Sequence, residues 1–134
     1  MTLQSDADIS KTDIVHRKGV KAAKREILLS FWKVHILHHA GEGPLHGQWV
    51  ISELRRHGYE ISAGTLYPLL KRMERVGWLK CRAEPGGGLR ARRNYRLTPA
   101  GEKVLATIRE QIKELYDEVV PVSEQNKIKR KEHD

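Results

Sequence analysis

The segment from Ser62 to Gly77 constrains the fold most strongly, because it contains the start, the stop and the buried face of one short helix. Serine is favoured at a helix N-cap, and glycine is favoured where a chain leaves a helix in a left-handed conformation. Between them, apolar side chains recur at helical spacing, at Leu66, Leu69, Leu70 and Met73. The segment therefore predicts an amphipathic helix that packs one face on a core and exposes the other.

The exposed face of this helix and the segment after it carry most of the net charge. Residues 71–96 contain nine Lys or Arg side chains and two Glu, a net charge of +7, and the whole chain has a formal net charge of +8. The glycines at 86–88 predict a turn, which Arg90, Arg92 and Arg93 follow closely. Because surface charges usually alternate in sign, this concentration predicts a contact surface for a polyanion, most naturally DNA.

The remaining pattern predicts a mainly α fold with a small β-hairpin. Residues 20–39 are apolar over more than half of a helical wheel, which is typical of a helix buried on more than one side. Further elements are expected as a helix over 45–57 ended by Gly58, strands near 78–83 and 92–97, and a helix from Thr98-Pro99 to Pro121. This order is that of a winged helix-turn-helix with an added C-terminal dimerisation helix.

Four segments follow from this order. Residues 1–18 are polar without a sustained helical period, and we expect a flexible N-terminal arm. Residues 19–98 are expected to form the winged helix-turn-helix, and residues 99–121 the dimerisation helix. The Lys- and Glu-rich segment 122–134 is expected to be a disordered tail.

Three motifs resemble the PadR family of bacterial transcriptional regulators. The turn Gly43–Gly47 resembles the family's turn between the first two helices, and Ala63–Glu74 resembles its recognition helix. The segment Arg93–Gly101 resembles the family's second wing strand and the entry to its last helix. The resemblance spans about residues 26–105 and is of the small type with a single C-terminal helix. It implies a homodimeric repressor that binds an inverted-repeat operator and is relieved by a signal such as a small hydrophobic or aromatic ligand.

The residues expected to contact double-stranded DNA lie on the recognition helix and the wing. Small residues at the helix start allow close approach to base edges, and cationic residues farther along suit phosphates. The expected contacts are Ser62, Ala63, Thr65, Tyr67, Lys71, Arg72, Arg75, Arg90, Arg92 and Arg93.

The last helix carries an apolar seam at spacings of three, four, three and four residues, as in a short coiled coil. The seam comprises Leu105, Ile108, Ile112, Leu115 and Val119. Together with Leu28 and Phe31 of the first helix, these residues are the expected dimer contacts.

Candidate sensing groups are fewer. Phe31, Trp32 and Trp49 are candidates for an aromatic effector pocket, with ordinary core packing as the alternative. His35, His38 and His39 have helical spacing suited to a shared metal, with interface histidines as the favoured alternative, so no metal or cofactor is predicted. Cys81, between Lys80 and Arg82, is a candidate redox switch or an inert thiol.

Other classes of protein fit the sequence poorly. Nucleophile elbows, phosphate-binding loops and paired carboxylates in a recognisable setting are not evident, so an enzyme is not expected. A single cysteine excludes an intramolecular disulfide, and the absence of an apolar signal region favours a cytoplasmic protein. A winged-helix adaptor for an acidic protein and a nonspecific architectural DNA binder remain as alternatives.

Overall fold

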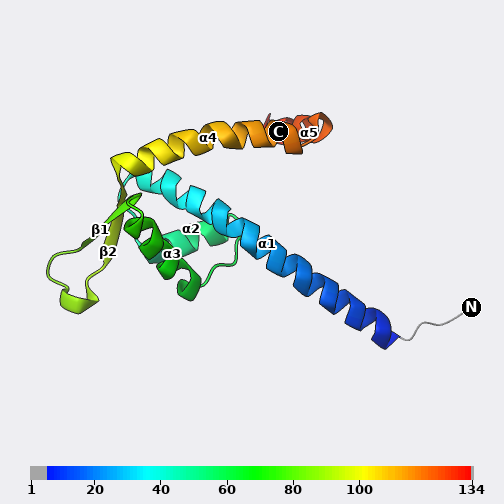
Figure 1. Ribbon diagram of the computed structural model, residues 1–134, viewed down its shortest axis with the longest axis horizontal. Helices are drawn as coiled ribbons and strands as arrows, with labels where there is room; N and C mark the ends of the chain where they lie inside the picture. The colour runs from blue at the N-terminus through cyan, green and yellow to red at the C-terminus, as the bar shows by residue number, and fades with distance from the viewer. Residues whose placement is uncertain (1–5, 134) are drawn as a thin grey trace, which may run out of the picture.

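A computed structural model describes residues 6–133 (Figure 1). Five α-helices flank a two-stranded hairpin. In chain order they are α1 (Asp6–Glu42), α2 (Gly47–Arg56), α3 (Ala63–Arg75), β1 (Leu79–Ala83), β2 (Arg93–Leu97), α4 (Pro99–Val119) and α5 (Val122–His133). A short 3-10 turn, Gly88–Arg90, lies at the tip of the hairpin. The expected mainly α fold with a small hairpin is confirmed.

The core lies where α1, α2, α3 and the hairpin converge. The apolar stripe of α3 is fully enclosed there, with Leu66 and Leu70 at 0% exposure. The C-terminal half of α1 contributes Trp32, Ile36 and Leu37, and α4 contributes Leu105. One apolar surface thus holds α3 in place, and the opposite face of α3 is left free.

Two glycines end α2 and α3 in the same way. Gly58 and Gly77 both have φ of +88°, a conformation that residues with a Cβ rarely adopt. After α2 the Tyr59 N–H donates to the Leu54 carbonyl at 3.0 Å, and after α3 the Trp78 N–H donates to the Met73 carbonyl at 3.0 Å. These are Schellman caps, and they confirm the glycine C-caps expected from the sequence.

The hairpin is antiparallel, and Leu79 pairs with Leu97 while Cys81 pairs with Tyr95. Its second strand also pairs with Leu45, because the Leu45 N–H donates to the Tyr95 carbonyl at 3.0 Å and the Tyr95 N–H donates to the Leu45 carbonyl at 2.7 Å. This bridge ties the hairpin to the chain directly before α2. The wing is therefore anchored at its base.

The start of α4 is locked to the end of α3. Thr98 is the N-cap, and its Oγ1 accepts from the Gly101 N–H at 3.0 Å while donating to the Gly77 carbonyl at 2.5 Å. Gly101 packs so closely on the Trp78 carbonyl and the Leu97 side chain that a Cβ there would overlap both. The expected N-cap with Pro99 at the first helical position is confirmed.

The structure corrects two expectations about the ends of the chain. Residues 6–18 belong to α1, and residues 122–133 form α5. Apolar periodicity reports burial, so its absence does not exclude a helix; residues 6–18 lack Gly and Pro and extend a helix already nucleated by packing. Residues 122–133 are rich in Glu, Gln, Lys and Arg, which are good helix formers. Residues 1–5 and 134 of the expected arm and tail lie outside the described residues.

Pro121 ends α4, as expected, but a further helix, α5, follows it. Val120, before this proline, is extended with φ of −91° and ψ of 118°, because the proline ring disfavours the helical conformation of the preceding residue. The Pro121 carbonyl then accepts from the N–H groups of Glu124 and Gln125 at 2.9 and 3.0 Å, which begins α5. Among residues 6–133, no helix combines the length and the apolar character needed to cross a bilayer.

We predict that Gly101→Ala destabilises the fold. The added Cβ must displace the Trp78 backbone or the Leu97 side chain, and overpacking of this kind costs about 1–3 kcal/mol. Gly64→Ala is the matched control, because Gly64 also lies in the first turn of a helix but its Cβ would meet only Ser62 Oγ at 3.8 Å. Thermal or urea unfolding of both variants tests this, and equal stability of the two would contradict it.

Candidate nucleic-acid interface

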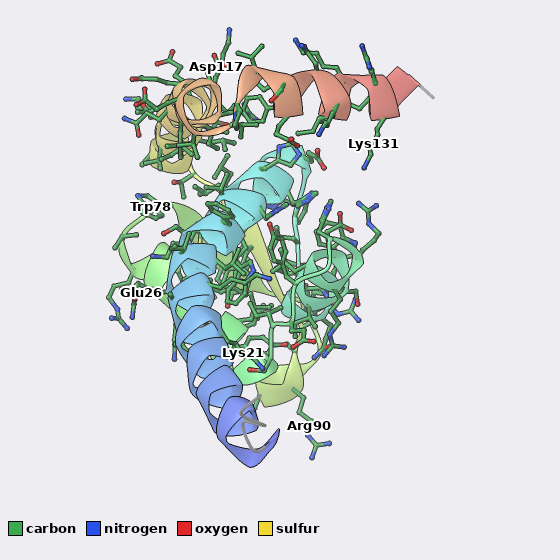
Figure 2. The ribbon with its side chains drawn as sticks, turned by 90° about the vertical axis from the view of Figure 1, so that its right-hand side faces the viewer. Lys21, Glu26, Trp78, Arg90, Asp117 and Lys131 are labelled. Atoms are coloured by element: carbon green, nitrogen blue, oxygen red, sulfur yellow. The ribbon has the colours of Figure 1, made fainter. Side chains whose placement is uncertain are left out.

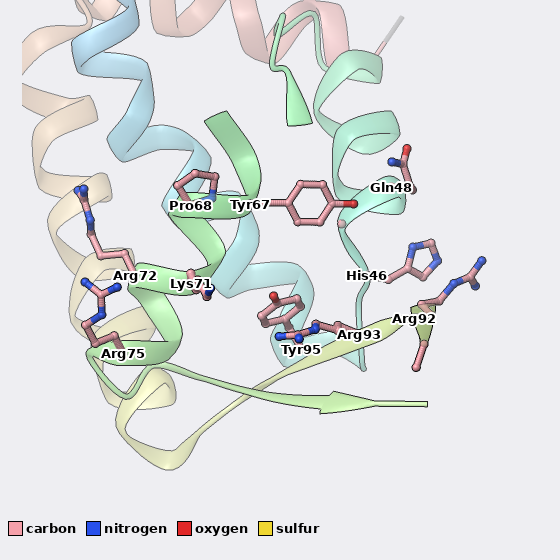
Figure 3. Close-up of a pocket in the computed structure, with 12 residues that line it drawn as sticks. His46, Gln48, Tyr67, Pro68, Lys71, Arg72, Arg75, Arg92, Arg93 and Tyr95 are labelled. Atoms are coloured by element: carbon pink, nitrogen blue, oxygen red, sulfur yellow. The ribbon is translucent and has the colours of Figure 1, made fainter. Parts of the chain in front are cut away.

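One basic groove joins α3, the wing and the start of α2. Tyr67, Lys71, Arg72 and Arg75 line it from α3, and Arg92 and Arg93 line it from the hairpin (Figure 3). His46, Gly47 and Gln48 close the side formed by α2. The structure therefore brings together six of the ten residues expected to contact DNA, from two parts of the sequence.

The position of α3 follows from its amphipathic pattern. Leu66, Leu69, Leu70 and Met73 point into the core, which turns Lys71, Arg72 and Arg75 outward as exposed side chains. The cationic groups lie on the outside because burying them without partners would be very unfavourable. Pro68 lies within α3 on the same exposed side, and its missing N–H falls near the first turns of the helix.

Tyr67 spans the gap between α3 and α2. Its ring projects toward the start of α2 in Figure 3. A Cβ built on Gly47 would lie 2.6 Å from a Tyr67 ring carbon, so the ring rests directly on the α2 backbone. With 42% of its surface exposed, Tyr67 both fixes the spacing of the two helices and presents an edge to the groove.

The N-terminal end of α3 differs from the expectation in one respect. Ser62 and Ala63 are exposed, as expected, but Thr65 is only partly exposed and its hydroxyl oxygen already accepts two hydrogen bonds. Its Oγ1 accepts from Arg25 Nη2 at 3.1 Å and from Ser62 Oγ at 3.3 Å. Thr65 is thus a hydrogen-bond acceptor within the chain, and its methyl group and its O–H donor stay available for other contacts.

Arg25 is a residue of this surface that sequence reasoning missed. It lies on α1, and the fold carries it to the start of α3. Lys21, Lys24 and Arg55 line a second basic groove with it, next to Ser62 and Thr65. The spacing of Lys21, Lys24 and Arg25 on one helix was the available signal, but their position beside α3 depends on how α1 crosses the domain.

The wing tip extends away from α4 and α5. Arg90 lies in the 3-10 turn and is exposed, and the neighbouring Leu89 is fully exposed. Figure 2 places Arg90 toward the same end of the molecule as Lys21, while Asp117 and Lys131 lie toward the opposite end. The exposed leucine at the tip was not anticipated, since a single apolar residue in a glycine-rich turn carries no pattern.

The apolar seam of α4 is buried at its N-terminal end and exposed farther along the helix. Leu105 is 4% exposed and packs in the core of its own chain, so it is withdrawn from the expected dimer contacts. Farther along α4, Ile112, Leu115 and Val119 are 45%, 56% and 65% exposed. Ile108 and Leu28 are partly buried, and Phe31 is exposed. The distal half of α4 thus carries an uncovered apolar face.

The three aromatic residues expected to line an effector pocket do not meet in one chain. Trp32 is buried and packs edge-on against Tyr59, with ring centroids 6.2 Å apart. Trp49 packs edge-on against His39 at 5.1 Å, and Phe31 is exposed. Trp32 lines the second basic groove instead.

Cys81 is partly buried and packs against the core beneath the wing. It pairs with Tyr95 across the hairpin, and burial, followed by the neighbouring Cys81, raises the pKa of Tyr95 to about 12. The redox role of Cys81 stays a prediction. Among the three candidate histidines, His35 and His39 are partly buried and His38 is exposed.

Comparisons with known proteins agree with this architecture. A model described as the transcriptional regulator PadR-like family matches residues 36–107. The transcriptional regulator Rv3488 of Mycobacterium tuberculosis is 47% identical over 96 residues, which cover 72% of this chain and 89% of that protein.

Solved structures share the fold. A PadR family transcriptional regulator from Eggerthella lenta is 33% identical with a TM-score of 0.63, covering 83% of this chain and 93% of its own. A PadR-like transcription factor from Bacteroides fragilis is 26% identical with a TM-score of 0.64, covering 73% and 95%. The family match includes most of the core, α2, α3, the hairpin and the start of α4. This chain belongs to the PadR-like family of transcriptional regulators.

Proposed function

We propose that this regulator binds double-stranded DNA in a sequence-specific manner as a homodimer, represses transcription, and releases its operator in response to a signal. The observation that carries the DNA interface is the shared basic groove of α3 and the wing. Cations from two separate elements converge on one face of the domain, which suits a helix in the major groove flanked by a wing on the backbone.

Within this interface the two ends of α3 contact different parts of the DNA. Ser62, Ala63 and the Thr65 methyl group lie at the N-terminal end, where small side chains permit contact with base edges and thymine methyls. Lys71, Arg72 and Arg75 lie farther along and contact phosphates. Arg90, Arg92 and Arg93 reach phosphates or the adjacent minor groove from the wing.

Arg25 extends the interface beyond the recognition helix. Its guanidinium lies at the α3 N-terminus, where backbone N–H groups also favour phosphate. Lys21, Lys24 and Arg55 surround the same groove. DNA on α3 would thus meet cationic side chains on both flanks, from the wing on one side and from α1 on the other.

The dimer is supported by the uncovered seam of α4. Exposed apolar side chains one helical turn apart form a face that a second copy would bury. We propose Ile108, Ile112, Leu115 and Val119, with Leu28 and Phe31, as the contacts. The repressor mode is carried over from the family resemblance.

The groove that contains Trp32 supports the proposal that a ligand relieves repression. The Trp32 indole N–H is buried without a hydrogen-bond partner among the described residues. Leu28, Trp32 and Tyr59 provide an apolar wall, and Lys21 and Arg25 provide cations at the rim. We propose that a hydrophobic or aromatic effector binds on this side of α1, next to the start of α3.

Selection from a random duplex library tests sequence-specific binding. We expect enrichment of one inverted repeat whose half-sites lie about one helical turn apart. Uniform weak binding that disappears at moderate salt would instead support a nonspecific architectural protein. Binding to an acidic protein without preference among duplexes would support the adaptor.

We predict that Tyr67→Ala, Arg92→Ala and Arg25→Ala each weaken binding to the selected duplex while leaving the protein folded. Loss of a phosphate contact from Arg92 or Arg25 should also reduce the slope of log affinity against log salt by about 0.9. Fluorescence anisotropy at several salt concentrations measures both quantities. Arg130→Ala on α5 is the control, because it removes an exposed charge far from α3 (Figure 1). Wild-type affinity in a folded variant would remove that residue from the interface.

We predict that Leu115→Asp converts the dimer to monomers. Leu115 is 56% exposed in the single chain, so the change leaves the core intact but places a charge in the proposed interface. Analytical ultracentrifugation reports the mass directly. Lys113→Asp introduces the same side chain at an exposed position off the seam and should keep the wild-type mass. An unchanged mass for Leu115→Asp would locate the interface elsewhere.

A further inference from the structure

Four metal-ligating side chains meet between α1 and the C-terminal end of α2, apart from the α3 and wing surface. His35 and His39 lie one turn apart on α1. Glu53 lies on α2, and His57 follows one turn later as the C-cap residue. One ring nitrogen of each of His35, His39 and His57 lies within 4.8 Å of the others. Two helices thus present paired ligands at the spacing of one turn toward a common point.

Glu53 brings an ionised carboxylate to this cluster. Its Oε1 lies 3.2 Å from Nε2 of His57 and 3.7 Å from Nε2 of His39. Arg56 donates to both carboxylate oxygens, at 2.6 and 3.1 Å. These hydrogen bonds, together with the Arg56 charge, lower the pKa of Glu53 to about 2. The carboxylate is held in place beside the three imidazoles.

Partial burial and aromatic neighbours shield much of the cluster from water. The His39 and Glu53 side chains are 16% and 13% exposed. Tyr59 packs edge-on against His35, and Trp49 packs edge-on against His39. The two α1 imidazoles are therefore enclosed between α1 and α2 and have aromatic neighbours that limit their motion.

We propose that His35, His39 and His57 bind one divalent transition-metal ion of the zinc class, with Glu53 as the fourth ligand or as the group that orients the imidazoles. In a tetrahedral zinc site with Zn–N bonds of about 2.0–2.1 Å, the nitrogens lie about 3.3 Å apart. The three rings therefore need to close by about 1.5 Å at most, which side-chain rotations provide. Imidazole with carboxylate is a common ligand set for zinc.

The ion would connect α1 to the segment that leads into the recognition helix. His57 caps α2, and Gly58 turns the chain directly after it. An ion bound by His57 and by the two α1 histidines would hold the end of α2 and this turn against α1. This site goes beyond the proposed DNA binding, and its test does not depend on that function.

Titration of tag-free protein with Zn²⁺ and with Co²⁺ tests the proposal. Calorimetry should give one Zn²⁺ per chain, and Co²⁺ should produce visible absorption typical of tetrahedral nitrogen and oxygen ligation. His39→Gln and His57→Gln should each weaken Zn²⁺ binding at least tenfold. Zn²⁺ should raise the melting temperature of the wild type and not that of these variants, since the ion binds the folded state.

Two control variants define the site. His46→Asn changes a histidine at the opposite end of α2 and keeps a good N-cap residue there. His38→Gln changes the exposed histidine that forms a separate group with His39 and Glu42. Both should bind Zn²⁺ with wild-type affinity. Failure of the wild type to bind Zn²⁺ stoichiometrically, or wild-type affinity in folded His57→Gln, would overturn the proposal and leave a hydrogen-bonded cluster around Glu53.

Discussion

Burial of the α3 stripe is the interaction on which the rest of the structure depends. Leu66 and Leu70 have no exposed surface, and they belong to one core cluster with side chains from α1, α2 and β1. Each fully buried side chain of this size contributes about 1.5–3 kcal/mol. Rotation of α3 about its axis would expose these groups and bury cations, so only one orientation is stable. The packing that holds the domain together is therefore also what presents Lys71, Arg72 and Arg75 to a partner.

Repulsion between like charges disfavours the exposed cationic surface that this packing produces. Cations on α3, the wing and α1 repel one another across the basic grooves, and few acidic side chains lie among them. Glu84 accepts from Asn94 on the hairpin, and Glu53 is engaged by Arg56 on the far end of α2. Most cations that face the grooves can therefore bind an anionic partner such as DNA phosphate. Counterions or DNA phosphates would relieve the repulsion, which makes stability as well as binding sensitive to salt.

Local signals in the sequence were sufficient to predict the elements between residues 20 and 121, but they could not predict the contacts between those elements. Gly58, Gly77 and Thr98 each end or begin a helix through groups within a few residues, so their roles could be predicted. The contact between Arg25 and Thr65 joins residues forty positions apart and depends on the angle at which α1 crosses α3. The meeting of His57 with His35 and His39 depends instead on how α1 packs against α2. Residues 6–18 and 122–133 were missed because their sequences lack the apolar period by which an amphipathic helix is predicted.

A single helix, α1, contributes residues to every proposed site. From its N-terminal side, α1 contributes Arg25 at the start of α3, then Leu28 and Phe31 as proposed dimer contacts, and then the two histidines of the proposed metal site. Neighbouring groups on one α-helix cannot move independently, because its hydrogen bonds fix a rise of about 1.5 Å per residue. A shift of α1 caused by a metal, a ligand or a change in subunit packing would thus move the Arg25 contact with Thr65 as well. A second stable position of α1 relative to α3 would therefore be enough to couple sensing to DNA binding in this chain.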